Sequence, residues 1–444
     1  MRKSTRRLIF YAAVVAFFLI TILVATYATG YWYDFENRQW VKTGAVFVSA
    51  NTQADFYLND EFSEQTSLLG GQLLLNRLVP DNYVISLVKS NYQAWQKQID
   101  IKAGEVASFS DILLVPINPE FASSSSGIRF TSTTPTGDRL LLLTDSAVVL
   151  FDLEDNQPAL AIPFAAAVLD SAKLRAIWES NGTAVVLADG ETTLQINFDN
   201  RTVSPLNSTS ANIISRAMLF NNQAYYLEGS ALRRYDLTSR LTATLINNVK
   251  SFWLDRSGSI FYSDTLKHQL WQADAQGGAR QLLSSDILAS DETIKSLANY
   301  ADGRLLLTNK KLYRLHDSAL TILAEGVSHY AISPNERVLA WHTTHEVWQL
   351  WLKNNDQQPY RLAGERELLQ STPDIIRNIY WHTDSRALIT EQLTGGKVIE
   401  SDTRGGVNIF TLVPLDFKSR LWYDTDGNYV YRLANGALTN WKFR

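Results

Sequence analysis

From residue 128 to the C-terminus the sequence repeats itself with a period of about 40 residues. Each copy has a strand-like run on either side of a tight turn, and at least one further run follows. The turn markers are eight in number and lie 33 to 49 residues apart: Gly137, Gly182, Asn222, Gly258, Gly303, Glu336, Ser385 and Gly427. A unit of this size cannot bury its apolar face alone, so neighbouring copies must stack. Four strands in each period of about 40 residues predict one blade of a β-propeller.

The segment 331–341 (AISPNERVLAW) gives the clearest turn between two strands. It resembles the repeats of TolB-like and WD40-like propellers, whose signature is a Ser-Pro-Asp-Gly turn. The resemblance implies a propeller over 128–444 with eight blades, or seven as the alternative. The last copy supplies only three strands. We expect the fourth to come from near residues 113–130, because closing the ring removes exposed sheet edges.

The N-terminus carries a different pattern, since no charge occurs from Leu8 to Tyr33. The run LIFYAAVVAFFLITILVATYA would span about 32 Å as a helix, enough for a hydrocarbon core of about 30 Å. The basic residues on its N-terminal side are Arg2, Lys3, Arg6 and Arg7. The positive-inside rule predicts a cytoplasmic tail at 1–7, a single membrane-spanning anchor at 8–29 in contact with the lipid bilayer, and extracytoplasmic domains beyond it.

Residues 30–42 form the predicted juxtamembrane segment, and its aromatic residues are typical of a membrane interface: Tyr31, Trp32, Tyr33 and Trp40. A cleaved signal peptide is the alternative, because Thr26-Tyr27-Ala28 has the small-x-small pattern of a cleavage site. The apolar part of a removable signal usually has about 7–15 residues. The longer run here favours an uncleaved anchor.

Six strand-like runs without helical periodicity follow, at 44–49, 54–59, 72–79, 83–89, 94–101 and 106–115. They predict a small all-β sandwich over 43–116. Residues 116–127 (PINPEFASSSSG) contain two prolines, a serine run and a glycine, which predicts a linker at 117–127.

Within the predicted sandwich, Gly44 precedes the first run, Asn59-Asp60 forms a turn, and Asn82-Tyr83, Asn91-Tyr92 and Trp95 follow in order. This order resembles that of PEGA domains, small β-sandwiches of bacterial envelope proteins. The resemblance implies a bacterial envelope protein and brings no catalytic residue with it. We expect Tyr83, Tyr92 and Trp95 to pack in the core of the sandwich, and a binding patch formed by the three is the alternative.

Composition excludes several classes of function. The chain has no cysteine, so it has no disulfide, thiolate metal site or cysteine nucleophile. Without the four basic residues of the tail, 37 basic and 45 acidic residues leave the rest of the chain at −8. Because phosphate binding needs clustered basic charge, we expect no nucleic-acid partner.

A search for catalytic motifs finds no Gly-x-Ser-x-Gly elbow, His-Glu-x-x-His, P-loop or Gly-x-Gly-x-x-Gly. We therefore expect no cofactor, no metal and no enzyme activity. His342, His345 and His382 are metal-ligating residue types without a fixed spacing, and we interpret them as surface or turn residues. Asp424 to Asn428 begins like a calcium loop, but it coincides with a repeat turn and is predicted to be one.

Tryptophans fall into two groups. Trp178, Trp253, Trp381 and Trp422 recur four or five residues before the turn marker, which predicts packing between blades. Trp341, Trp348 and Trp351 lie together in one copy. These three are the candidate ligand-binding residues, since indoles can stack on sugar rings.

The sequence as a whole predicts a membrane-anchored, extracytoplasmic binding or scaffolding protein, whose propeller recognises an envelope protein or a cell-wall glycan. One alternative is a glycan-active hydrolase or lyase with carboxylates in the propeller channel. A purely structural scaffold is another, and an exposed apolar patch on the blades would favour it.

Overall fold

The computed structural model describes residues 3–34, 38–164, 169–214, 217–300 and 303–443. Its N-terminal element is the helix α1 (Lys3–Ala28), which continues for 26 residues because the run contains neither Gly nor Pro. The part Ile9–Ala28 has a mean hydropathy of 2.6 and is not buried against the rest of the protein. It is long and apolar enough to cross a bilayer. The helix begins at Lys3 rather than at residue 8, and Arg2 lies outside the described residues.

A short hairpin follows the helix, formed by β1 (Tyr31–Asp34) and β2 (Gln39–Lys42). The hairpin brings the chain back to the end of α1, where the Thr43 N–H and hydroxyl both donate to Gly30 O at 2.9 Å. Residues 30–42 were predicted only as a juxtamembrane segment; their described parts, 30–34 and 38–42, pair with each other and add little distance between helix and sandwich.

The sandwich has two sheets, with strand orders β6-β3-β9 and β5-β4-β7-β8. Six of its strands match the predicted runs: β3 (Gly44–Ala50), β4 (Asp55–Leu58), β6 (Gln72–Leu78), β7 (Asn82–Val88), β8 (Trp95–Asp100) and β9 (Val106–Ile112). The seventh, β5 (Glu61–Gln65), was not predicted, because its residues are exposed throughout and show no apolar alternation. Trp95 is buried between the sheets, and Tyr83 and Tyr92 pack against the same core as predicted.

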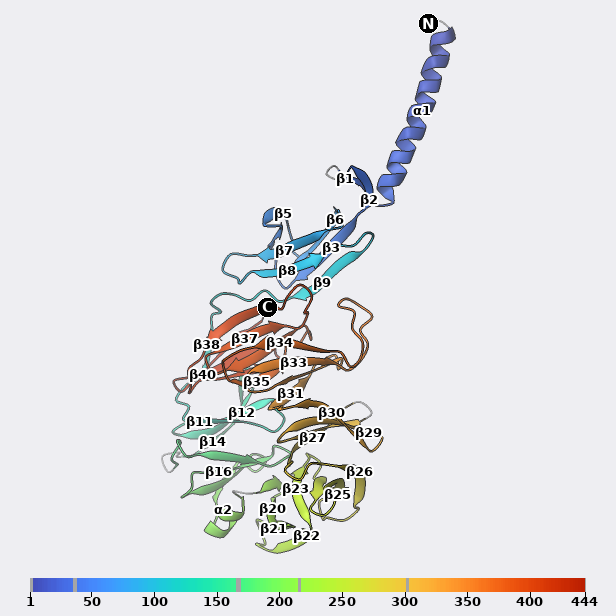
Figure 1. Ribbon diagram of the computed structural model, residues 1–444. Coiled ribbons are helices and arrows are strands. Elements are labelled where there is room, and N and C mark those ends of the chain that lie inside the picture. The colour runs from blue at the N-terminus through green and yellow to red at the C-terminus, as the bar shows by residue number, and fades with distance from the viewer. Residues whose placement is uncertain (1–2, 35–37, 165–168, 215–216, 301–302, 444) are drawn as a thin grey trace.

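The propeller has eight four-stranded sheets within the described residues, which confirms the predicted fold class and the larger blade number (Figure 1). Blades 1 to 4 consist of β11 (Phe130–Thr133), β12 (Arg139–Leu143), β13 (Ala147–Asp152) and β14 (Gln157–Pro163); β15 (Arg175–Trp178), β16 (Ala184–Ala188), β17 (Thr193–Asn197) and β18 (Thr202–Pro205); β19 (Met218–Phe220), β20 (Gln223–Glu228), β21 (Ala231–Asp236) and β22 (Thr242–Ile246); and β23 (Val249–Leu254), β24 (Ile260–Asp264), β25 (Gln269–Ala273) and β26 (Gln281–Ile287). A short helix, α2 (Ser208–Ile214), joins blades 2 and 3.

Blades 5 to 8 consist of β27 (Ile294–Tyr300), β28 (Gly303–Thr308), β29 (Lys311–His316) and β30 (Ala319–Glu325); β31 (His329–Ile332), β32 (Val338–His342), β33 (Glu346–Trp351) and β34 (Arg366–Ser371); β35 (Ile376–Trp381), β36 (Ala387–Gln392), β37 (Gly395–Glu400) and β38 (Ile409–Pro414); and β39 (Arg420–Asp424), β40 (Tyr429–Ala434), β41 (Ala437–Lys442) and β10 (Ala122–Ser125). First strands of neighbouring blades contact one another, as β31 and β35 do, so the first strands surround the central channel.

The ring closes through β10, which pairs antiparallel with β41 as the outer strand of blade 8. This is the fourth strand expected from near residues 113–130. It also corrects the predicted linker at 117–127, because part of that segment belongs to the propeller. This pairing joins the N-terminal side of the domain to its last blade and covers the outer edge of β41, which blade 8 would otherwise leave unpaired.

Seven of the eight predicted turn markers lie between the first and second strand of their blade. In blade 5 Gly303 is the first residue of β28, and residues 301–302 of that predicted turn lie outside the described residues. In blade 8 the Gly427 N–H donates to the Asp424 carboxylate, so this segment is a turn, as predicted. The recurring tryptophans pack between blades. Three of their indole N–H groups reach the first strand of a neighbouring blade: Trp178 to Ser132, Trp381 to Ala331 and Trp422 to Thr133, each at 3.0 Å.

Candidate functional site

The sandwich and the propeller share one hydrophobic core. Val46 and Phe109 of the sandwich belong to the same buried cluster as Phe410 of blade 7 and Tyr423 and Phe443 of blade 8. Figure 1 shows the sandwich between α1 and these blades, with blades 2 to 4 at the far end of the molecule. The two domains therefore meet through buried apolar surface rather than through a free linker.

Side-chain amides pair with the strand edges at this junction. The Gln93 amide donates to Thr411 O at 2.7 Å and accepts from Thr411 N–H at 2.9 Å. In the same manner Asn408 accepts from Gln96 N–H at 3.3 Å and donates to Gln96 O at 3.1 Å. Gln93 therefore pairs with β38, and Asn408 pairs with β8, as a residue of an added strand would. Each amide satisfies backbone groups at the edge of a sheet.

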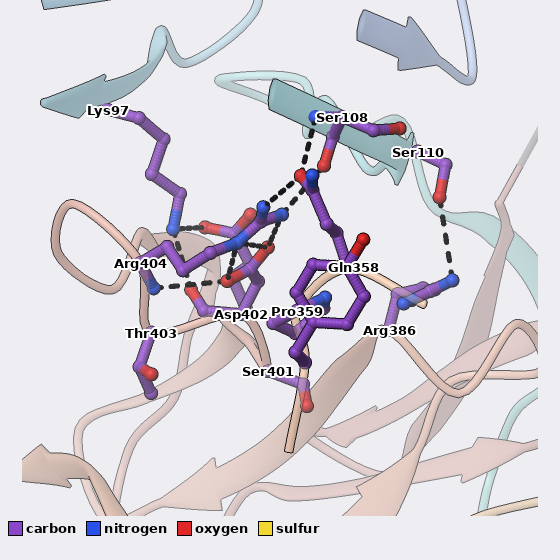
Figure 2. A network of polar contacts seen from close by, with 12 residues as sticks. Lys97, Ser108, Ser110, Gln358, Pro359, Arg386, Ser401, Asp402, Thr403 and Arg404 are labelled. Carbon is purple, nitrogen blue, oxygen red and sulfur yellow. Dashed lines mark hydrogen bonds and ion pairs between the residues drawn. The ribbon is translucent and has the colours of Figure 1, made fainter. Parts of the chain in front are cut away.

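A third amide comes from blade 6, on an arm formed by residues 352–365 between β33 and β34. Gln358 accepts from Ser108 N–H at 2.7 Å and donates to Val106 O at 2.8 Å, so it pairs with the edge strand β9 (Figure 2). The sequence signal of this arm is the largest spacing between turn markers, 49 residues from Glu336 to Ser385. No feature of the sequence indicated that Gln358 pairs with β9 of the sandwich.

The arm is held by a partly buried carboxylate on β34. Glu367 forms an ion pair with Arg361 at 2.8 Å. Burial alone would raise the pKa of Glu367, but hydrogen bonds from Arg361, Thr403, Trp351 and Gln349 outweigh it and hold this pKa below its ordinary value. The ionised form of Glu367 therefore ties the arm to blades 6 and 7.

Two cations hold the loop between β37 and β38 at the junction (Figure 2). Lys97 is 0% exposed, and its ammonium lies 2.8 Å from Glu400 Oε2, 2.6 Å from Asp402 O and 2.5 Å from Gly406 O. Arg404 lies over the Phe109 ring at 4.2 Å and donates to Gln358 Oε1 and Ser108 O, both at 2.7 Å.

Gly405 lies at the closest approach of this loop to the sandwich. Its φ of +64° is in the left-handed region, and a Cβ there would collide with Gln98 O, so only glycine fits. In the sequence this Gly405-Gly406 pair has a counterpart 128 residues earlier, Gly277-Gly278, and this recurrence gives no indication of a contact with the sandwich.

A pocket of about 350 Å³ lies beside this network, between β9 and the turns of blades 6 and 7. Its walls combine apolar and polar side chains, among them Phe109, Trp351, Pro359, Arg337, Ser385 and Arg386. The Arg337 guanidinium donates to Asn355 Oδ1 at 3.0 Å and is otherwise exposed at the rim. The lining residues include no histidine, so the Ser385 hydroxyl has no imidazole base among them. Such a pocket can bind a ligand of mixed polarity.

The candidate ligand-binding tryptophans do not form one platform. Trp341 and Trp351 are 4% and 5% exposed, and they lie in separate clusters on opposite faces of blade 6. Trp348 stacks on Trp341 with 6.2 Å between ring centres, in the cluster between blades 5 and 6. Positions 348 and 351 are three apart and point to opposite faces of one strand, so these indoles fill the blade interfaces and offer no shared surface to a sugar ring.

The histidines that the sequence singled out make separate contacts. The Nδ1 atoms of His342, His345 and His382 lie 2.7 Å from Thr343 O, 3.1 Å from Asp374 O and 2.9 Å from Asp384 Oδ1, respectively. Within the described ranges, no three His, Asp or Glu side chains are grouped so that they could hold a metal ion.

Among the residues that the structure describes, two carboxylates have raised pKa values, and both hold the fold together. Burial raises the pKa of Glu391, although Arg420 and Arg377 each lie 3.5 Å from it. Burial, followed by the charge of Asp426, raises the pKa of Asp424, which accepts the turn N–H described above. Neither carboxylate lines the junction pocket.

Aromatic residues gather where α1 meets the hairpin. Trp32 lies 6.3 Å from the Tyr27 ring, and Tyr33 packs edge-on against Trp40 at 5.4 Å. Tyr31 and Trp32 are both exposed. Of the basic residues predicted to flank the anchor, Lys3, Arg6 and Arg7 belong to the start of α1.

No family model matches the chain, and no curated protein matches it. Solved propeller structures are similar at low identity. The β-propeller domain of Cps50 (Swd1) from Myceliophteria thermophila is 12% identical, with 74% of this chain and 100% of that chain covered and a TM-score of 0.39. Hsv2 from Kluyvelomyces marxianus is 10% identical, with coverages of 66% and 99% and a TM-score of 0.41.

Dipeptidyl peptidase 4 from Porphyromonas gingivalis is 9% identical, with coverages of 70% and 56% and a TM-score of 0.42. None of these similarities assigns a function to this chain, because propellers carry many unrelated functions.

Proposed function

We propose that this chain is a single-pass membrane protein of the bacterial envelope, with its N-terminus in the cytoplasm, which displays a propeller outside the membrane to bind a partner protein. The observation that carries the proposal is the junction of sandwich and propeller. There a shared core, three edge-pairing amides and the buried Lys97 join the two domains, and a pocket of mixed polarity lies beside them.

A rigid junction suits a protein that presents a binding surface at a fixed place above the membrane. An enzyme tethered only for localisation would need no such joint. The long apolar α1 supports anchoring, and the PEGA-like order of residues in the sandwich supports an envelope location. We favour a protein partner over a cell-wall glycan because the indoles of Trp341 and Trp351 are buried inside blade 6.

The test uses the full chain in nanodiscs. Photo-crosslinking groups at Asp356 and Gln357, exposed residues of the pocket wall, would capture proteins from the envelope, and each would then be purified for a binding titration. We expect Arg337→Glu to weaken saturable binding by about tenfold or more, which corresponds to about 1.4 kcal/mol. The matched control is Lys267→Glu, an exposed charge on blade 4.

Equal affinity for the wild type and both variants would place the binding surface elsewhere. A parallel titration with cell-wall glycan fragments distinguishes the two partner classes. Saturable binding of a glycan, with no protein captured, would contradict the proposed partner class.

A further inference from the structure

We propose that the membrane-facing end of the sandwich is a phospholipid-binding surface, in which Arg77 binds a headgroup phosphate of the leaflet next to the end of α1. This inference rests on α1 crossing the membrane, as in the function proposed above. It adds a second contact with the bilayer. It also gives a chemical partner to Arg77, which belongs neither to the propeller repeats nor to the pocket nor to the junction.

Contact between Arg77 and the helix fixes the position of this surface. The Arg77 guanidinium carbon lies 4.2 Å from the centre of the Tyr27 ring. Tyr27 is the second-last residue of the apolar span Ile9–Ala28. When the span lies in the hydrocarbon core, Tyr27 is at the headgroup level, and Arg77 is held at the same depth.

A β-bulge turns the Arg77 side chain toward Tyr27 of α1. In the pairing of β3 with β6, Gly44 faces Leu78 and Ala45 faces Asn76, so Arg77 is an extra residue without a partner in β3. Its φ is +67°, a left-handed conformation that costs a residue with a side chain about 1–2 kcal/mol. Bulges re-aim side chains, and this one directs an exposed guanidinium onto an aromatic ring of the helix.

No spacer separates this surface from the membrane. Both hydrogen bonds from Thr43 end on Gly30, two residues after α1. The intervening hairpin presents Trp32 and Trp40, which are 39% and 55% exposed, as expected of side chains at a lipid interface. The sandwich therefore begins at the level where the helix leaves the bilayer.

The chemistry of Arg77 selects a phosphate. A guanidinium donates two parallel hydrogen bonds to a phosphate group, and it can keep one face on an aromatic ring while doing so. Glu105 and Asp81 are exposed near this end of the sandwich, so the surface is not uniformly basic. We therefore expect a local contact with single headgroups rather than attraction to overall membrane charge.

The experiment exploits the absence of cysteine from the chain. A single cysteine at Asn76, next to Arg77, carries an environment-sensitive fluorophore, and the matched control carries it at Leu69. That position lies in the turn beyond the far end of β6, which begins at Gln72, about 13 Å from Asn76 for four residues at about 3.3 Å each. Full-length protein is reconstituted into vesicles of zwitterionic and anionic phospholipids that contain a headgroup spin label, and quenching is measured at both positions.

We expect strong quenching at position 76 and little at position 69. Flotation of the protein with the vesicles tests the anchor separately. Protein that fails to float would refute the anchor in the proposed function. Protein that floats but shows no more quenching at 76 than at 69 would refute this inference alone.

Two substitutions test the guanidinium itself. Arg77→Asn tolerates the left-handed backbone and removes the charge, whereas Arg77→Lys keeps the charge. Quenching at position 76 should fall by at least half in Arg77→Asn and persist in Arg77→Lys. Wild-type quenching in Arg77→Asn would overturn the phosphate contact, because the helix and hairpin alone would then hold the sandwich at the membrane.

Discussion

Replacing Lys97 by methionine should separate the sandwich from the propeller without creating a cavity. Methionine has nearly the length of lysine and suits an apolar surrounding, but it donates no hydrogen bond. The substitution leaves Glu400 without its cation and leaves the carbonyls of Asp402 and Gly406 without their donor.

The expected loss follows from these contacts. Removing one partner of a buried ion pair costs about 3–5 kcal/mol. Glu400 keeps hydrogen bonds from Trp95 Nε1 at 3.0 Å and from Asn408 Nδ2 at 2.8 Å. We therefore expect a loss at the lower end of this range of free energies. A loss of about 3 kcal/mol, at about 1.4 kcal/mol for each factor of ten, corresponds to roughly a 100-fold larger population of the open junction.

Hydrogen exchange of the full chain reports this opening directly. Amide protons of Gln96 and Gln98, which bond to Asn408 and Gly405, should exchange roughly 100-fold faster in Lys97→Met. Amides of β20 to β25 on the far blades serve as the internal control. Exchange of Gln98 at the wild-type rate would refute the role assigned to Lys97. The double variant with Glu400→Gln should lose less stability than the sum of the two single changes.

Three further predictions concern the arm and the channel. Gln358→Ala should destabilise the pairing with β9 by about 1–2 kcal/mol, seen as faster exchange in β9, whereas exposed Gln357→Ala should have no effect. Because the pKa of Glu367 is lowered, ionised Glu367 stabilises the protein fully above the ordinary pKa of 4.5, and this stabilisation is lost as the pH falls through the lowered value. Glu367→Gln should therefore lower the melting temperature at pH 7. The melting temperature of this variant should also depend less on pH in the acid range. The His329 side chain is exposed on the first strand of blade 6, yet desolvation by the protein around it, followed by the nearby His342, lowers its pKa to about 4; an NMR titration should find the midpoint there, with His329→Gln identifying the signal.

Sequence reasoning succeeded where structure is encoded locally. The eight turns recur because each blade needs a tight connection after its first strand, and Gly, Asn and Asp supply the backbone conformations. The apolar run of α1 is equally local. Ring closure by β10 was expected from topology, since a final blade of three strands needs a fourth.

The junction was missed because its residues resemble ordinary surface positions in the sequence. Gln93 and Thr411 are 318 residues apart, and an isolated glutamine carries no signal of pairing with a strand edge. Lys97 lies on the same buried face of β8 as Trp95 and Ile99, but a single lysine on that face gives no indication that its partner is Glu400 of blade 7. Trp351 was grouped with Trp341 by proximity in sequence, although the two lie on opposite faces of their blade.

The central claim is that sandwich and propeller form one rigid body on the membrane anchor. Spin labels on cysteines introduced at Leu69 and Lys267, both exposed, would report the distance between the sandwich and blade 4 in nanodiscs. The account predicts a single narrow distance distribution, which becomes broad when Lys97→Met is added. A broad distribution in the otherwise unaltered chain would contradict it.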